Sequence, residues 1–304
     1  MPSLAMSSAI VSTEERVAEC LNRFGDGVVS AGRRRWSITL PGDGAARTMV
    51  VVGRDWLVVE KTLRDCRLAR IDDVQRWGPR LLDAALDRPS GARPVLCAED
   101  NLPRMRAERC LPPRASDDDD LRHWLESACG DAAVVDQSTI AANDVHNSPE
   151  REEATRADIP ALCELAGWPA RPRGTSDETL VDLPTRDGRM CHAIAAVEGA
   201  AARCRVALEL ESKGETSPAC LAAMVVALLR AAGSVRLVRA TLSHADARLA
   251  AVLDVRMPPP FGAETLNHAL SSLAVARQQI AAELDVLAGD DALARAYLAL
   301  QGVR

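Results

Sequence analysis

The chain has 304 residues, 47% of them hydrophobic and 26% charged, which is typical of a globular protein long enough for two domains. Its net charge of −6 argues against nucleic-acid binding by the chain as a whole. The nine cysteines are widely spaced and form no CxxC pair, which predicts free thiols in a reducing compartment.

The first half of the sequence predicts a helix, three strands, a helix, two strands and a final helix. In the first helix, Val17, Cys20 and Leu21 have the spacing of one helix face. The last helix follows Ser116 and a run of aspartates, which suit a helix N-terminus. In chain order, these elements are expected at residues 13–24, 33–44, 48–63 (two strands that part at 53–55), 72–88, 95–98, 104–110 and 116–135.

The second half predicts the same order of elements. Its central helix has Ser217 as the N-cap, Pro218 at the first position and Gly233 after the end. The expected elements lie at residues 156–168, 179–188, 190–199, 202–212, 217–233, 235–243, 248–257 and 262–289.

Four short sequences of the first half recur in the second half in the same order. ITLPGDG at 38–44 corresponds to VDLPTRDG at 181–188, LLDAAL at 81–86 to LLRAAG at 228–233, CLPP at 110–113 to MPPP at 257–260, and LRHWLES at 121–127 to LNHALSS at 266–272. The offsets range from 143 to 147, as loop insertions allow. We therefore interpret the chain as two tandem copies of one module. The predicted domains are residues 13–137 and 154–304, joined by a polar linker at 138–153.

The sequence lacks the common motifs of nucleotide-binding, catalytic and metal-binding sites. The chain has no GxGxxG, GxxxxGK[ST], HExxH or GxSxG motif and no EF-hand loop. Cys191 and His192 are neighbours on an expected strand, so their side chains point to opposite faces and cannot chelate one metal together. We expect no catalytic residues, no cofactor and no metal.

Several polar and aromatic residues could carry a function or only serve the structure. His123 and His268 lie on the flank of the repeated helix, and we interpret them as half-exposed polar positions. The run DDDD at 117–120 is interpreted as a solvated helix N-terminus. For Trp56 and Trp124 we expect core packing.

The helix expected at 217–233 is apolar on all sides, which predicts that a second surface covers it. We expect that cover to be the other module, through its helix at 81–88. Val226 should face this contact, whereas Val225 should face the core of its own module. The candidate interface between the modules, or toward a partner, comprises Leu81, Leu82, Ala85, Ala222, Ala223, Val226 and Leu229.

The apolar run at 220–229 is ten residues long, which is too short to cross a bilayer. The N-terminal segment has neither the basic region nor the long apolar core of a signal peptide. We expect a cytoplasmic protein that does not contact a membrane.

The order of elements resembles the fold of type III secretion chaperones of the Tir-chaperone class and of YbjN-like proteins. LVDLPTRDGRMCHAIA at 180–195 resembles the opening hairpin of that fold, and LLRAAGSVRLVRATLS at 228–243 resembles its middle helix and the following strand. The resemblance implies an α+β protein of two tandem α-β-β-β-α-β-β-α modules, each an antiparallel sheet packed against helices. Because the family is usually a single-copy homodimer, two copies in one chain would form an intramolecular pseudo-dimer.

The same resemblance implies a non-enzymatic binding or adaptor protein that holds a protein or peptide segment on an apolar surface. One alternative is a bacterial metabolic or regulatory enzyme with a site made of non-contiguous residues, and another is a pseudo-dimer without a ligand groove. A deep cleft with converging His, Asp or Arg side chains would favour the enzyme, and a broad, shallow apolar groove the adaptor. In solution the chain would be a monomer or a homodimer.

Overall fold

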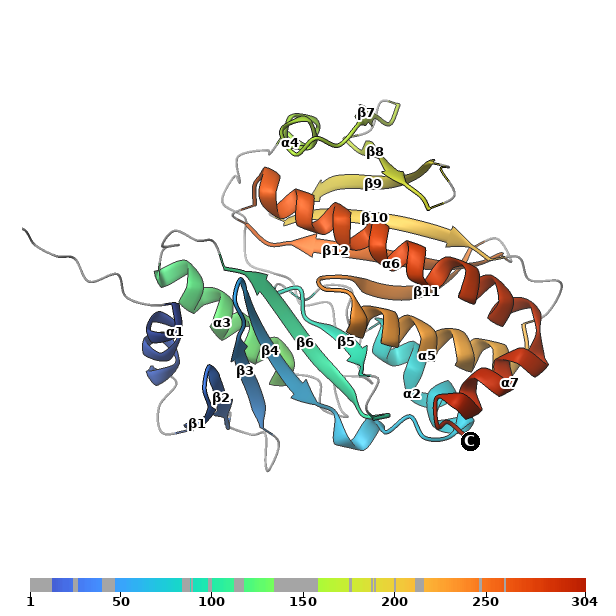
Figure 1. Cartoon of the computed structure of the whole chain (residues 1–304), viewed down its shortest axis with the longest axis horizontal. Helices are drawn as coiled ribbons and strands as arrows, with labels where there is room; N and C mark the ends of the chain where they lie inside the picture. Colours follow the sequence, from blue (N-terminus) through green and yellow to red (C-terminus); the bar gives the residue numbers. More distant parts are fainter. Residues whose placement is uncertain are drawn as a thin grey trace, which may run out of the picture.

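Two antiparallel sheets of six strands each form the framework of the molecule (Figure 1). The computed structural model describes residues 13–23, 27–39, 47–83, 88, 90–97, 100–111, 118–133, 158–174, 177–186, 188, 190–199, 201–210, 216–245, 248–259 and 261–304. Within these residues the chain has seven α-helices and twelve strands and is an α+β protein. The expected linker at 138–153 lies outside the described residues.

The first half contributes three α-helices and one sheet. In chain order its elements are α1 (Thr13–Asn22), β1 (Val28–Gly32), β2 (Arg35–Ile38), β3 (Thr48–Val52), β4 (Trp56–Thr62), a short 3-10 helix (Arg64–Cys66), α2 (Ile71–Asp83), β5 (Arg93–Leu96), β6 (Pro103–Cys110) and α3 (Asp118–Ala133). The strand order is β1-β2-β3-β4-β6-β5, and all neighbours are antiparallel.

The second half contributes four α-helices and the other sheet. Its elements are α4 (Ile159–Leu165), β7 (Ala170–Pro172), β8 (Thr179–Pro184), β9 (Met190–Glu198), β10 (Ala201–Glu209), α5 (Pro218–Ser234), β11 (Arg239–Ala245), β12 (Arg248–Met257), α6 (Ala263–Gly289) and α7 (Asp291–Leu300). The strand order is β7-β8-β9-β10-β12-β11, again antiparallel throughout. Matched strand by strand, the two sheets have the same order.

Each half has four strands before its central helix, one more than the sequence predicts. The additional strands are β1 and β7, which lie at the outer edges of their sheets. Four of the five residues of β1 are exposed, and all three of β7 are, so neither strand shows the alternation of a half-buried strand. β7 also ends in Pro172, a residue that sheets tolerate at an edge. Helix α7 was likewise not expected.

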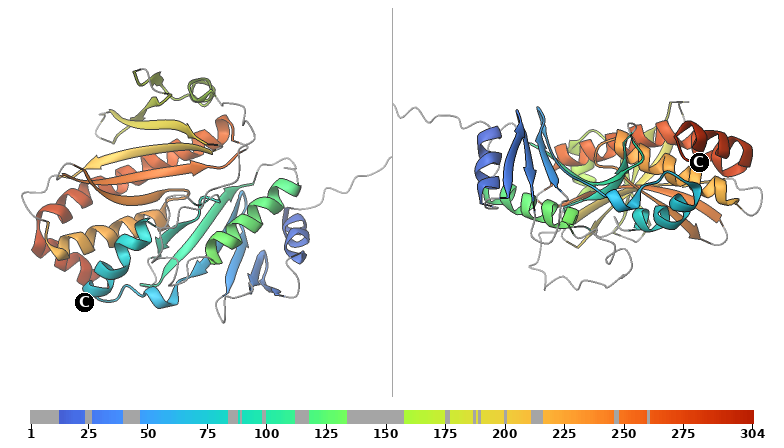
Figure 2. Two further views of the ribbon diagram at one scale, coloured as in Figure 1. Left: turned by 180° about the vertical axis from the view of Figure 1, so that it is seen from behind. Right: turned by 90° about the horizontal axis from the view of Figure 1, so that it is seen from below.

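The buried face of each sheet packs against helices of its own half. β3 and β4 alternate between buried and partly exposed residues, which places one side of the first sheet on the core. Helix α3 packs on this sheet, and α6 packs on β8, β10 and β12 of the other. Figures 1 and 2 show that α3 and α6 lie on opposite sides of the molecule. Among the described residues, no helix combines the length and the apolar character that a membrane span requires.

The central helices α2 and α5 join the two halves. They pack against each other, α5 also packs on β5 of the first half, and α2 packs on β11 of the second. Helix α5 begins where the sequence predicts: the Ser217 side chain accepts a hydrogen bond from the Cys220 N–H, and Pro218 is the first residue. The buried apolar residues of both halves form one continuous cluster.

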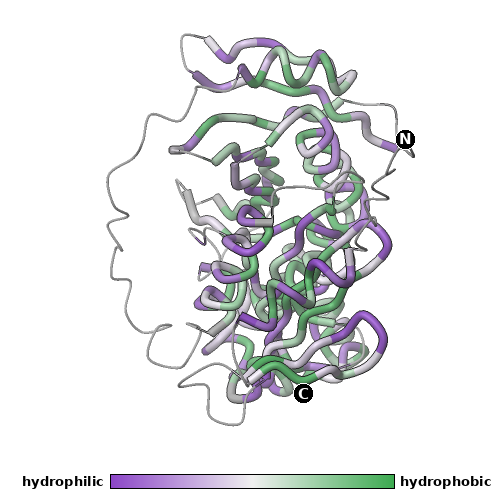
Figure 3. The backbone as a smooth tube through the Cα atoms, turned by 90° about the vertical axis from the view of Figure 1, so that its left-hand side faces the viewer, coloured by the Kyte–Doolittle hydropathy of each residue, from purple (hydrophilic) through white to green (hydrophobic). Residues whose placement is uncertain are grey.

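The C-terminal segment returns to the first half. Helix α7 packs on α5, and Figure 3 shows strongly hydrophobic stretches of backbone beside the C-terminus. Leu298 and Val303 are buried there. The Arg304 N–H donates to the Ala69 carbonyl, and the Ile71 N–H donates to the Arg304 carbonyl. These two backbone hydrogen bonds connect the C-terminal residue to the start of α2.

Candidate functional site

The residues predicted for the interface between the modules lie on α2 and α5. Those that the structure describes are all buried in the common core: Leu81, Leu82, Ala222, Ala223, Val226 and Leu229. The remaining member of the set, Ala85, lies outside the described residues. Helix α5 can be apolar on all sides because neighbouring elements cover it. Helix α2 and strand β5 cover one part of its surface, and helices α6 and α7 cover another. Both halves therefore contribute to the cover of α5.

The two central helices approach each other most closely at Gly78 and Val225. A Cβ atom added to Gly78 would lie 2.5 Å from Cγ1 of Val225, so only glycine fits at this contact. Val225 therefore faces α2, contrary to the expectation that it faces its own module's core. In the alignment of LLDAAL with LLRAAG, Gly78 corresponds to Val225 itself.

Two buried ion pairs join corresponding strands of the halves. Arg93 of β5 donates to Glu108 of β6 at 2.5 Å, and Arg239 of β11 donates to Asp254 of β12 at 2.6 Å. In each pair the acid follows the arginine by 15 residues, and both arginines are at most 2% exposed. Each pair of counterparts is 146 positions apart. Charges this deeply buried are tolerated because they are paired and hydrogen-bonded.

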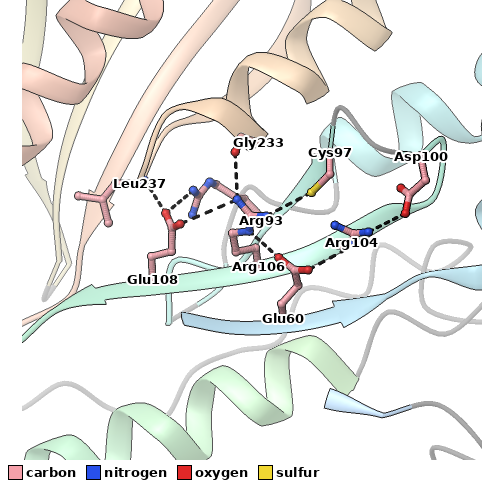
Figure 4. Close-up of polar contacts among 9 residues, drawn as sticks. All are labelled: Glu60, Arg93, Cys97, Asp100, Arg104, Arg106, Glu108, Gly233 and Leu237. Carbon is pink, nitrogen blue, oxygen red and sulfur yellow. Dashed lines mark hydrogen bonds and ion pairs between the residues drawn. The ribbon is translucent and has the colours of Figure 1, made fainter. Parts of the chain in front are cut away.

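The first of these pairs also binds the second half (Figure 4). Glu108 accepts a hydrogen bond of 2.9 Å from the Leu237 N–H, just before β11. Arg106, beside it on β6, donates to the Gly233 carbonyl at 3.0 Å and to the Cys97 sulfur at 3.3 Å. Burial by itself would raise the pKa of the Glu108 carboxyl, but Arg93, the Leu237 N–H and Arg106 together hold it below its ordinary value. Glu108 is therefore ionised at neutral pH.

Leu237 has a backbone conformation that favours glycine. Its φ is +65°, which costs a bulky residue about 1–3 kcal/mol. The corresponding residue of the first half, 146 positions earlier, is Gly91, with a φ of +74°. The hydrogen bond from Leu237 to Glu108 helps to hold this strained turn in place.

Beside the turn, a cavity of about 270 Å³ opens between the halves, and we name it the interhalf cleft. Its apolar lining comprises Trp56, Trp124, Leu237, Met257, Pro258 and Pro259. Its other lining residues are Ser90, Gly91, Glu108, Arg109, Cys110, Asp120, Arg256, Glu264, Thr265 and His268. The ends of β6 and β12 and the starts of α3 and α6 contribute, so corresponding segments of both halves meet there.

Aromatic and charged groups converge on one wall of this cleft. The rings of Trp56 and His268 meet edge to face, with centroids 5.7 Å apart. The Arg236 guanidinium lies 4.8 Å from the centroid of the Trp56 ring, a cation–π distance. His268 Nε2 is 3.9 Å from Glu264. Trp56 thus joins strand β4 of the first half to two residues of the second.

Two further groups of the cleft, Arg109 and Cys110, do not present a free charge. Arg109 forms an ion pair with Asp120 and also donates to the Asp120 carbonyl. Burial, together with the charges of Glu264 and Asp55, raises the pKa of the Cys110 thiol, so that it stays protonated at neutral pH. All nine cysteines of the chain are free.

The sequence alone did not identify this cleft. His268 lines it and is half-exposed, as expected, whereas its counterpart His123 is exposed and is not among the lining residues. Asp120 pairs with Arg109 instead of only facing solvent, and Trp56 is partly exposed at the cleft. The repeated CLPP and MPPP segments were the available signal, because each follows a strand that ends at the cleft.

A second hollow of about 350 Å³ lies between the end of β5 and helices α5, α6 and α7. Tyr297 lines it, and burial together with the neighbouring Glu283 raises the pKa of its hydroxyl. Within the part of the chain that the structure describes, no group of three or more His, Cys, Asp or Glu side chains is placed to hold a metal ion. In comparisons with known proteins, no family model matches the sequence and no curated protein matches it.

Proposed function

We propose that the chain is a non-enzymatic binding or adaptor protein resembling a type III secretion chaperone or a YbjN-like protein. Its two halves act as tandem modules that form an intramolecular pseudo-dimer. The ligand is a segment of a partner protein, and the interhalf cleft receives it.

The internal correspondence supports the pseudo-dimer. In a two-fold dimer, equivalent residues meet at the axis. Gly78 and Val225 correspond in the sequence and form the closest contact between the central helices. The strand orders of the two sheets and the pairs Arg93–Glu108 and Arg239–Asp254 are repeated as well.

The observation that carries the proposal is the interhalf cleft itself. Ligand sites prefer interfaces between domains, and this cleft lies between the halves and combines apolar walls with polar and charged groups. Its volume of about 270 Å³ lies near the lower end of ligand pockets, so it suits one bulky side chain of a bound segment. This site is smaller and more enclosed than the broad groove expected of an adaptor.

Selection from a random peptide library, followed by affinity measurement with the selected peptides, tests the proposal. Thr265→Trp would fill the cleft from α6, whereas Val275→Trp places the same ring on an exposed position of that helix, outside the cleft. We expect peptides that bind the natural chain to lose at least tenfold in affinity for T265W and to keep it for V275W. Equal binding by both variants, or no peptide binder, would overturn the proposal.

The runner-up is a metabolic or regulatory enzyme, favoured by the convergence of Asp120, Glu264 and His268 on the cleft. Against it, Asp120 is held by Arg109, and the Cys110 thiol is protonated. An enzyme would bind small metabolites in preference to peptides. A thermal-shift screen separates the two, because a ligand at a hundred times its dissociation constant stabilises by about 2.7 kcal/mol.

A further inference from the structure

We infer that the partner segment, whose binding is the proposed function, carries a bulky apolar side chain next to an acidic one. The apolar side chain would enter the interhalf cleft, and the carboxylate would bind Arg236 at its edge. Trp56 lies between the two subsites, because it lines the cleft and stacks with Arg236.

The apolar subsite follows from the walls of the cleft. Trp124 and Met257 are almost fully buried, and Leu237 and Pro258 close the space beside them. Such walls offer a ligand only dispersion contacts and removal from water, which favour a large apolar side chain. The whole cavity, whose volume is about 270 Å³ and whose other walls are polar or charged, has room for one such side chain.

The acidic subsite is inferred from which arginines around the cleft already have partners within the chain. Arg109 is already paired with Asp120, and Arg256 has interactions of its own within the chain. Arg236 is exposed, and among the described residues no carboxylate pairs with it. It is therefore the guanidinium beside the cleft that can take a new anion.

Stacking leaves Arg236 able to bind this anion. A guanidinium uses its flat face on an aromatic ring, whereas its N–H groups lie in the plane and remain directed outward. A carboxylate can approach in that plane and accept two hydrogen bonds. Glu264, which also lines the cleft, would repel the acid and so favours its binding at Arg236.

The test uses two synthetic peptides that differ in one residue, Ac-Gly-Trp-Asp-Gly-NH2 and Ac-Gly-Trp-Lys-Gly-NH2. Nuclear magnetic resonance titration of the full chain measures both affinities. We expect the Asp peptide to bind roughly five- to tenfold more tightly than the Lys peptide, as a partly exposed ion pair allows. Arg236→Glu should reverse this order.

Arg76→Glu is the matched control, because Arg76 also stacks on a tryptophan, Trp77, at 5.1 Å but lies on α2, away from the cleft lining. It should leave the preference for Asp unchanged. If peptides bind in a manner that T265W abolishes but show no preference that Arg236→Glu reverses, the inference is wrong and the proposed function stands. If neither these nor selected peptides bind, both fail.

Discussion

The central helices α2 and α5 occupy corresponding places in the two halves and pack against each other, yet their outer faces differ. On α2, the exposed Arg76 and Arg80 flank the half-exposed Trp77, at 5.1 and 5.8 Å from its ring. The corresponding residues of α5 are Ala223, Met224 and Ala227, all buried. The same position thus has a polar outer face in one half and an apolar one in the other.

The difference follows from what covers each helix. Helix α6 has 27 residues where α3 has 16, and it packs along α5, as does α7. A helix buried on all sides needs no polar face, whereas a helix with an exposed side does. The second half therefore carries the larger share of the core.

The largest effect should come from breaking the contact that the two helices share. Val225 is 2% exposed, and Val225→Asp would bury a carboxyl against α2. We expect a loss of about 4 kcal/mol or more in the free energy of unfolding, because the group has no partner there. Urea unfolding followed by tryptophan fluorescence measures this loss.

Arg76→Asp, on the outer face of α2, is the control and should change stability by less than about 0.5 kcal/mol. Should Val225→Asp not fold at all, Val225→Ala should still lose roughly 1–3 kcal/mol. Wild-type stability for both Val225 variants would show that the helices do not depend on this contact.

The buried pair Arg93–Glu108 should have the next largest effect. Glu108→Gln leaves the Arg93 guanidinium buried without a carboxylate, which costs about 3 kcal/mol at pH 7. Because the folded-state pKa of Glu108 is lowered, its ionised form stabilises the fold above the unfolded pKa of about 4.3. This stabilisation is lost as the pH falls through the lower, folded value.

The difference between the natural chain and E108Q should therefore shrink below about pH 4. Urea unfolding at a series of pH values measures it. Glu264→Gln serves as the control, since this side chain is 73% exposed. A difference that stays constant with pH would contradict the role given to the ionised carboxylate.

The sequence was sufficient for the repeated order of elements but not for the number of strands or for the cleft. Ser217, Pro218 and the apolar pattern after them predicted α5 to within one residue at each end, because capping and periodicity are local properties. β7 has three exposed residues without a strand-like pattern, and it forms through pairing with β8 and contact with α4. The cleft depends on which residues approach each other from distant segments, such as Trp56 and His268, and no local pattern encodes that approach.

A smaller effect should follow from adding one methyl group between the helices. In Gly78→Ala the new Cβ would lie 2.5 Å from Val225 Cγ1, so the helices must separate, which costs about 1–3 kcal/mol. Val225→Ala removes that Cγ1. We expect the double variant to be more stable than the sum of the two single losses predicts, by at least 0.5 kcal/mol in a double-mutant cycle. Additive losses would mean that Gly78 and Val225 do not limit the approach.

The smallest effect should come from the outer face of α2, at Trp77. Trp77→Ala removes a half-exposed ring that packs only in part against the core and has Arg76 and Arg80 beside it, so we expect a loss of about 1 kcal/mol. The same change at the corresponding residue, Met224→Ala, removes a fully buried side chain of α5 and should lose about 2–5 kcal/mol. Urea unfolding of the two variants under one set of conditions compares the faces directly. Equal losses would mean that another surface covers α2 in solution, as in a homodimer, and the molecular mass in solution would then be twice that of the chain.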